Sequence, residues 1–273
     1  MNMKNCRNII LAAAVLAAAS SCSDKVQIKG TIAGAPDTQV VVKQLNGGAL
    51  VALDTVKTDG KGAYSYSVEV LKGQPQFIYL YKGDTKVASL LLQKGDKVKV
   101  ASDTLGKYSV EGSAESELLR QVEEDFAAFL DKFTADAARG DNAAASKDYI
   151  DYYRGRVKFI MENAKSLTAI PVLYQKINDN FPVFSQATDA IMFRNVHDSL
   201  MTVYPESRYV SALAREAEKR FNAFDLSQRI QNAQESSYPD LYLPSVDGTK
   251  VRLSEVGSKV VLVYFWQAAD AAQ

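Results

Sequence analysis

The cysteines of this sequence are its first candidates for chemistry, because a thiolate can act as a nucleophile or as a metal ligand. The chain has 273 residues but only two cysteines, Cys6 and Cys22, and a single histidine, His197. Two cysteines cannot build a disulfide scaffold, and with one histidine they leave little for a transition-metal site. We therefore expect this protein to hold neither a metal nor a cofactor.

Acid–base chemistry has two further candidates. His197 could act as a general base, but a base also needs an orienting partner and a nucleophile, so we expect a surface or packing residue. Glu123, Glu124 and Asp125 could supply a pair of carboxylates. Because adjacent acids on a helix point around it rather than at one substrate, we expect a solvated helix face there.

The charge balance bears on nucleic-acid binding. The chain has 32 basic and 32 acidic residues, and this net charge of zero gives no bulk attraction to polyanions. Tyr149, Tyr152 and Tyr153 with Arg154 and Arg156 could form an anion or nucleic-acid patch. Acidic residues flank them, so we expect a solvated helix face and no nucleic-acid partner.

The first 22 residues have the composition of a secretory signal. Lys4 and Arg7 precede an apolar run over residues 9–19, and small residues lead from there to Cys22. The run is too short to span a bilayer, which takes roughly 20 apolar residues. An ordinary signal with an incidental cysteine is one interpretation. The segment AASSC also resembles the lipobox of bacterial lipoproteins, which implies a signal peptide over residues 1–21 and a lipid on Cys22.

Residues 22–112 have the pattern of a β domain. Short apolar or alternating runs recur about every ten residues, separated by turns of glycine, asparagine and aspartate. We predict an antiparallel β-sandwich or open barrel. Its tyrosines, Tyr64, Tyr66, Tyr79 and Tyr81, could contact a glycan or a peptide, but their alternation with other residues makes core packing the expected role.

Residues 113–235 have the pattern of helices. Glycines become rare, Ser113 is a plausible helix start, and apolar residues recur at spacings of three and four from Leu118 to Phe133. Together with the β domain, this region predicts an α+β fold. Further helices are expected over residues 147–167, 169–181, 186–203 and 208–229.

Residues 236–273 have the pattern of an entry to a parallel-sheet fold. Two short strands are expected on either side of Asp247-Gly248, followed by a buried strand over Val260–Trp266. The order of these elements up to Phe265-Trp266 resembles the start of the thioredoxin-like proteins of the peroxiredoxin and cytochrome-maturation type. That resemblance implies a Cys-x-x-Cys site, whose two positions fall here on Asp270 and Gln273. It also implies that the sequence contains an incomplete thioredoxin-like domain.

The β domain resembles a known family as well. Ile28-Lys-Gly-Thr-Ile32, Asp54-Thr-Val-Lys-Thr-Asp-Gly60 and Val110-Glu-Gly-Ser113 are similar to the β domain of unknown function that precedes a thioredoxin-like domain in many Gram-negative lipoproteins. In that family a helical segment of the kind seen at 113–235 links the two domains. The resemblance implies an anchor in the cell envelope, facing the periplasm or the cell surface.

Two classes of function follow from these patterns. The first is a membrane-anchored lipoprotein with a non-catalytic binding or scaffolding role, whose partner is an envelope protein or a glycan. The second is a thiol–disulfide oxidoreductase or antioxidant protein, as the thioredoxin-like resemblance implies. Asp270 has no sulfur for a mixed disulfide and Gln273 cannot resolve one, so we expect no disulfide exchange at this site.

Overall fold

The computed structural model describes residues 24–232, 240–258 and 260–264. The predicted signal peptide, Cys22, Asp270 and Gln273 lie outside these described residues. The chain divides into two compact units, one that ends at Phe224 and one that begins at Asp225.

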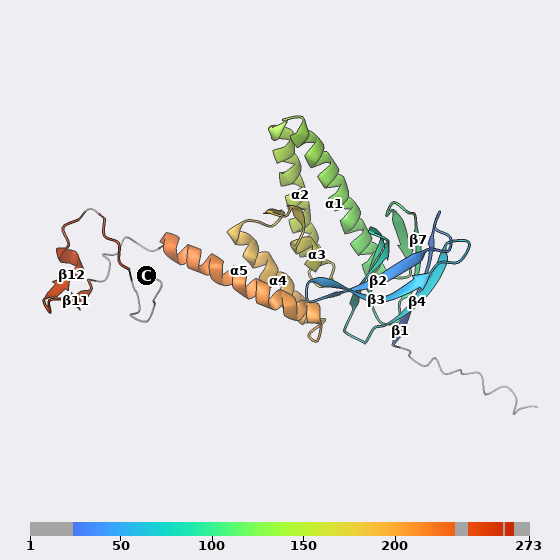
Figure 1. Ribbon diagram of the computed structural model, residues 1–273, viewed down its shortest axis with the longest axis horizontal. Coiled ribbons are helices and arrows are strands. Elements are labelled where there is room, and N and C mark those ends of the chain that lie inside the picture. The colour runs from blue at the N-terminus through green and yellow to red at the C-terminus, as the bar shows by residue number, and fades with distance from the viewer. Residues whose placement is uncertain (1–23, 233–239, 259, 265–273) are drawn as a thin grey trace, which may run out of the picture. The chain divides into compact units, whose positions relative to one another are not determined.

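Eight strands near the start of the first unit form two sheets of four strands each (Figure 1). The outer sheet has the order β4-β1-β7-β8, and the central sheet has the order β3-β2-β5-β6. The turn between β2 and β3 lies at Gly47-Gly48, and the positive φ of both residues explains why glycine stands there. The strands are β1 (Lys25–Ile32), β2 (Gln39–Asn46), β3 (Ala49–Lys57), β4 (Ala63–Glu69), β5 (Gln76–Lys82), β6 (Thr85–Leu92), β7 (Lys97–Ser102) and β8 (Tyr108–Glu111).

The two sheets pack face to face around an apolar core, as a sandwich. Alternate residues of β1 and β7, such as Ile28 and Val98, are buried between the sheets, while Lys29 and Lys99 are exposed. The described strands form no closed barrel. This arrangement confirms the predicted α+β class with an N-terminal sandwich.

One pairing differs from the prediction, because β1 and β7 run parallel and the outer sheet is therefore mixed rather than antiparallel. A parallel pair needs a long crossover connection. Here the crossover includes all of the central sheet together with β4. Turn residues in the sequence reveal which strands are joined by hairpins, but not which distant strands become neighbours.

Five α-helices follow the sheets in the part of the chain that the structure describes. The first begins as predicted, because Ser113 accepts a hydrogen bond from the Ser116 N–H at 3.3 Å. The second begins earlier than predicted, because Asp141 caps it through the Ala144 N–H at 3.0 Å. Figure 1 shows α1 and α2 lying side by side as a long hairpin. The helices are α1 (Ala114–Ala138), α2 (Asn142–Glu162), α3 (Ala169–Leu173), α4 (Ala190–Met201) and α5 (Arg208–Asn232).

The helix predicted over residues 169–181 is shorter than expected, because α3 ends at Leu173. Two short strands, β9 (Lys176–Asn178) and β10 (Phe181–Pro182), follow it as a hairpin. The Asn178 side chain accepts the Asn180 N–H at 3.0 Å, and this local turn competes with the helix. A short 3-10 turn, η1 (Ala187–Asp189), then leads into α4.

The helices cover the second face of the central sheet. Phe77 of β5 and Leu91 of β6 belong to the same buried cluster as Leu119 of α1, Phe193 of α4 and Leu213 of α5. Strands β5 and β6 are thus buried on both faces, which explains their nearly continuous apolar runs, whereas β3 at the edge of the same sheet is exposed. The outer sheet buries only one face.

The second unit contains a short hairpin of β11 (Tyr242–Pro244) and β12 (Lys250–Arg252) around Asp247-Gly248, as predicted. The strand predicted over Val260–Trp266 is wrong for its described part, since residues 260–264 are irregular and exposed. Strand geometry depends on pairing with a neighbouring strand, and no described strand pairs with these residues. None of the described helices is long and apolar enough to span a bilayer.

Candidate ligand-binding site

The tyrosines of the β domain do not gather on one face. Tyr64 is buried in the sandwich core, whereas Tyr66 packs only partly against that core. Tyr79 lies on the other face of the central sheet, among the helices. Tyr81 is half-buried beneath the Lys43 ammonium, which lies 4.1 Å from its ring centroid. Core packing, the expected role, holds for Tyr64, and the four rings form no shared surface for a glycan or a peptide.

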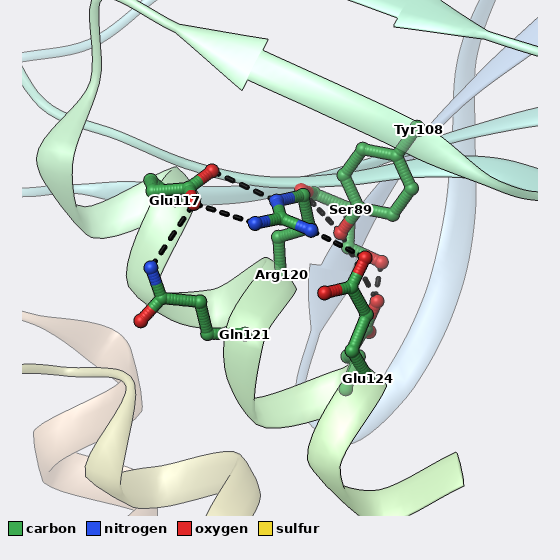
Figure 2. Close-up of polar contacts among 7 residues, drawn as sticks. Ser89, Tyr108, Glu117, Arg120, Gln121 and Glu124 are labelled. Carbon is green, nitrogen blue, oxygen red and sulfur yellow. Dashed lines mark hydrogen bonds and ion pairs between the residues drawn. The ribbon is translucent and has the colours of Figure 1, made fainter. Parts of the chain in front are cut away.

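One acid of the run on α1, Glu123, forms a structural brace, whereas Glu124 and Asp125 are exposed as predicted. Glu123 accepts hydrogen bonds from Lys86 at 2.6 Å and Ser89 at 2.8 Å, both on β6, and from Tyr108 on β8 at 3.2 Å. Figure 2 shows the Ser89 and Tyr108 side chains converging on α1. Ser89 is fully buried. The cluster thus joins the helix to both sheets and leaves the hydroxyl of Ser89 closed to a substrate.

The neighbouring acids of α1 point in other directions, as predicted. The guanidinium of Arg120 lies between Glu117 and Glu124 and pairs with both (Figure 2). The hydrogen bonds that Arg120 donates lower the pKa of Glu117 to about 2. Asp125 pairs with Arg156 of α2 at 2.9 Å. Glu117 and Glu124 meet only at the Arg120 guanidinium, and Asp125 pairs elsewhere, so these carboxylates do not form an acid–base pair.

The tyrosine-rich stretch of α2 is neither an anion patch nor a solvated face. Tyr149 donates to the Val183 carbonyl at 2.9 Å, Tyr152 to Gln175 at 2.8 Å and Tyr153 to Asp189 at 2.6 Å. These three hydroxyls attach the segment between α3 and α4, which contains β9, β10 and η1, to the helix. The prediction of a solvated face is therefore wrong for the tyrosines.

His197 has a local partner only. Its Nδ1 lies 2.9 Å from a carboxylate oxygen of the adjacent Asp198. No described serine, threonine or cysteine hydrogen-bonds to the ring. The ring is half-buried, which agrees with the expected surface or packing role.

A cavity of about 660 Å³ lies where the β2–β3 hairpin and β5 meet α3 and α5. Leu45 and Phe77 form its walls on the sheet side, and Ile170 and Leu213 form them on the helix side. Phe77 and Leu213 are almost fully buried. A volume of this size is typical of small-molecule sites, which are apolar hollows with a few polar groups.

Tyr209 fixes one wall of the cavity. Its hydroxyl accepts a hydrogen bond from the Phe77 N–H and donates one to the Leu45 carbonyl, each at 3.2 Å. The ring lies edge-on to Phe77, with the centroids 4.9 Å apart. The first turn of α5 is therefore attached directly to β2 and β5.

Two further tyrosines line the cavity with uncharged hydroxyls. Burial is the main cause that raises the pKa of Tyr79, and nearby Glu123 adds to it. Burial also raises the pKa of Tyr174, with Glu216 as the next cause. Both phenols stay protonated at neutral pH, so they can donate hydrogen bonds but do not repel an anion.

Three cations of α5 line the same cavity: Arg208, Arg215 and Lys219. Their spacings of seven and four place them on one face of the helix. Glu216 also lines the cavity, but its carboxylate already pairs with Arg220 at 2.6 Å. No described residue forms an ion pair with Arg215 or Lys219. The cavity thus combines apolar walls with an excess of positive charge.

Sequence reasoning missed these cations. Their signal was present, because the helix predicted over residues 208–229 carries Arg208, Arg215 and Lys219 along one stripe. The stripe alone could equally have faced water, and only the approach of the β2–β3 hairpin turns it into the rim of a cavity. Among the described residues, no group of three or more histidines, cysteines or acids could hold a metal ion.

Comparison with known families places the β strands in a defined domain. Residues 26–119 match the family described as "Domain of unknown function (DUF4369)". The match covers the whole sandwich after its first residue and the first turns of α1. No curated protein matches the chain. The chain therefore contains a DUF4369 domain over residues 26–119, with a β-rich structure.

Proposed function

We propose that this chain is a lipid-anchored protein of the cell envelope that binds a small amphipathic anion in the cavity between the central sheet and α5. The single observation that carries the binding proposal is the cavity itself, in which apolar walls from four elements meet two cations, Arg215 and Lys219, that form no ion pair with a described residue. Such a hollow suits a ligand with an apolar body and an anionic head.

The charge of the rim argues for an anionic head. Arg208 donates to the Gln76 side chain, whereas Arg215 and Lys219 remain available to a ligand. Removing a cation's hydration without a partner is unfavourable, so a bound carboxylate or phosphate would compensate these charges. A cationic ligand of the same length would instead meet repulsion.

The anchor and the absence of thiol exchange rest on the sequence. The lipobox-like segment before Cys22 supports lipidation and an envelope location, facing the periplasm or the cell surface. Asp270 and Gln273 at the positions of a Cys-x-x-Cys pair support a non-catalytic role. The alternative, a thiol–disulfide oxidoreductase, predicts turnover in an insulin-reduction assay, which we expect to be at background.

Binding is tested by isothermal titration with three ligands of one chain length: octanoate, octanol and octylamine. We expect octanoate to bind most tightly and octylamine most weakly. An exposed ion pair contributes about 0.2–1 kcal/mol, so the double variant Arg215→Gln/Lys219→Gln should bind octanoate about 2- to 30-fold more weakly. Its affinity for octanol should not change.

Arg154 and Lys158 of α2 supply a matched control, because they have the same residue types and spacing on an exposed helix face. The variant Arg154→Gln/Lys158→Gln should bind octanoate as the unmodified chain does. Equal affinity for all three ligands, or an equal loss in both double variants, would contradict the proposed site.

A further inference from the structure

The outward face of the outer sheet is rich in lysine. The side chains of Lys25 and Lys29 on β1, and of Lys97 and Lys99 on β7, alternate with core residues and are all exposed. Two acids share this face, Glu69 opposite Lys25 and Glu111 opposite Lys99. The face therefore carries an excess of positive charge, although the whole chain has none.

Three of these lysines, Lys29, Lys97 and Lys99, are called the basic face below. Lys29 and Lys99 lie directly opposite each other on neighbouring strands. Lys97 lies on β7, two residues before Lys99. Like charges in opposite positions destabilise a sheet. No described residue forms an ion pair with any of the three. An external anion would relieve this repulsion.

A shallow hollow of about 700 Å³ adjoins the basic face. Its lining includes three lysines, one acid and two hydroxyl residues: Lys29, Lys57, Lys99, Asp59, Thr31 and Ser65. Lys57 also pairs with Asp37 at 3.0 Å at the margin of the hollow. Ammonium and hydroxyl donors on a flat surface suit the oxygens of a phosphate group.

The chain length between the proposed anchor and the sheet restricts what can reach this face. Lys25, the first residue of β1, follows Cys22 by three positions. Three residues span at most about 11 Å, even when fully extended. A lipid on Cys22 would therefore hold the start of β1 within about 11 Å of the headgroups, which is less than two Debye lengths of about 8 Å at physiological salt.

We infer that the basic face is a docking surface for the anionic phospholipid headgroups of the membrane that holds the anchor. The inference rests on the lipid anchor of the proposed function, but not on ligand binding in the cavity. A lipid on one residue and a basic surface act together, since each lysine near an anionic bilayer adds to its attraction. The outer sheet would then face the bilayer.

The experiment uses the lipidated full chain in vesicles of phosphatidylcholine, alone or with phosphatidylglycerol. Neither lipid has a primary amine, so acetylation of lysines can be followed residue by residue with mass spectrometry. We expect Lys29, Lys97 and Lys99 to be labelled about fivefold more slowly on the anionic vesicles, and this protection to disappear in 0.5 M salt. Lys158 and Lys165 in the helical region should be labelled equally on both.

Two triple variants distinguish an effect of the basic face from an effect of the net charge of the chain. In the full chain without its lipid, Lys29→Gln/Lys97→Gln/Lys99→Gln should weaken sedimentation with anionic vesicles about tenfold or more. A triple variant with the same change of charge on the helical side, Lys158→Gln/Lys165→Gln/Lys176→Gln, should not. Equal labelling on both vesicles, or equal losses in the two triple variants, would overturn the inference.

Two further outcomes are informative. Protection of the three lysines by inorganic phosphate without vesicles, to the extent seen on anionic vesicles, would overturn a bilayer surface in favour of a small-anion site. The mass of the peptide that contains Cys22 reports lipidation in the same samples. An unmodified Cys22 would refute the anchor. The difference in labelling between the two kinds of vesicle would still show whether the basic face binds anionic headgroups.

Discussion

The hydroxyl of Tyr209 takes the place of a backbone hydrogen bond between β2 and β5, and its removal provides a quantitative test of how α5 is attached to the central sheet. The pairing of β2 with β5 ends at Gln44 and Ile78, so Leu45 and Phe77 would form the next pair. Instead, the Tyr209 hydroxyl lies between the Phe77 N–H and the Leu45 carbonyl, at 3.2 Å from each. Tyr209→Phe would leave both backbone groups without this partner.

The expected cost follows from burial. Phe77 is 1% exposed, and an unsatisfied buried donor costs about 1–3 kcal/mol. The Leu45 carbonyl is only partly buried, and its lost hydrogen bond adds about 0.5–1 kcal/mol. The variant Tyr209→Phe should therefore lower the free energy of unfolding by about 2–4 kcal/mol.

Tyr64 supplies a matched control of the same residue type and the same 6% exposure. Its hydroxyl is buried in the sandwich and has no hydrogen-bond partner among the described residues. Tyr64→Phe removes a group that was desolvated without compensation, so its effect should be neutral, or stabilising by about 1 kcal/mol.

Urea unfolding measures both variants. Circular dichroism is the suitable signal, because the only tryptophan, Trp266, lies outside the described residues. With a slope of about 2–3 kcal/mol per molar urea, Tyr209→Phe should shift the midpoint down by about 1 M. A change below about 0.5 kcal/mol for Tyr209→Phe, or equal losses in the two variants, would refute this account of the sheet–helix attachment.

Two further predictions concern the outer sheet and the α1 ion pairs. A Cβ at Gly30 would lie 2.0 Å from the Tyr64 ring, so Gly30→Ala should destabilise the fold by about 1–3 kcal/mol. Gly155 lies in open space on α2, so Gly155→Ala should stabilise the fold by about 0.5–1 kcal/mol. Thermal unfolding of the two variants should show these opposite signs. Arg120→Gln should raise the pKa of Glu117 from about 2 towards its ordinary 4.5, as followed by carbon NMR of the carboxyl group. Because the pKa of Glu117 is lower in the folded than in the unfolded chain, its stabilisation is present above about pH 4.5 and is lost as the pH falls towards 2. The variant Arg120→Gln should therefore lose less stability than the unmodified chain over this pH range. A Glu117 titration unaltered by the substitution would disprove the role of Arg120.

The local signals of the sequence predicted much of the fold. Glycine turns such as Gly47-Gly48, the alternation of Tyr64 with Ser65, and the cap at Ser113 each depend on residues close in sequence, and each predicted element is present. The described part of the strand expected over Val260–Trp266 is absent, because a strand is stabilised by neighbours that composition cannot provide.

The cavity was less accessible to sequence reasoning than the fold. The stripe of Arg208, Arg215 and Lys219 can be read from the helical period, but the sheet residues opposite it cannot. Leu45 and Arg215 are far apart in the chain and line one hollow only because α5 returns to the β2–β3 hairpin. The role of Glu123 could not be predicted either, because its hydrogen-bond partners on β6 and β8 are distant in sequence from the acidic run of α1.

The sequence by itself determined the class of elements, and it supplied the residue types at Cys22, Asp270 and Gln273 on which the proposed anchor and the proposed non-catalytic role rest. These are properties of residue type and short spacing. The tertiary structure decided that β1 pairs parallel with β7, that Lys29 faces Lys99, and that cations of α5 meet an apolar wall. Such features depend on which distant segments bury each other's apolar faces, and that choice is made by the packing of the whole unit.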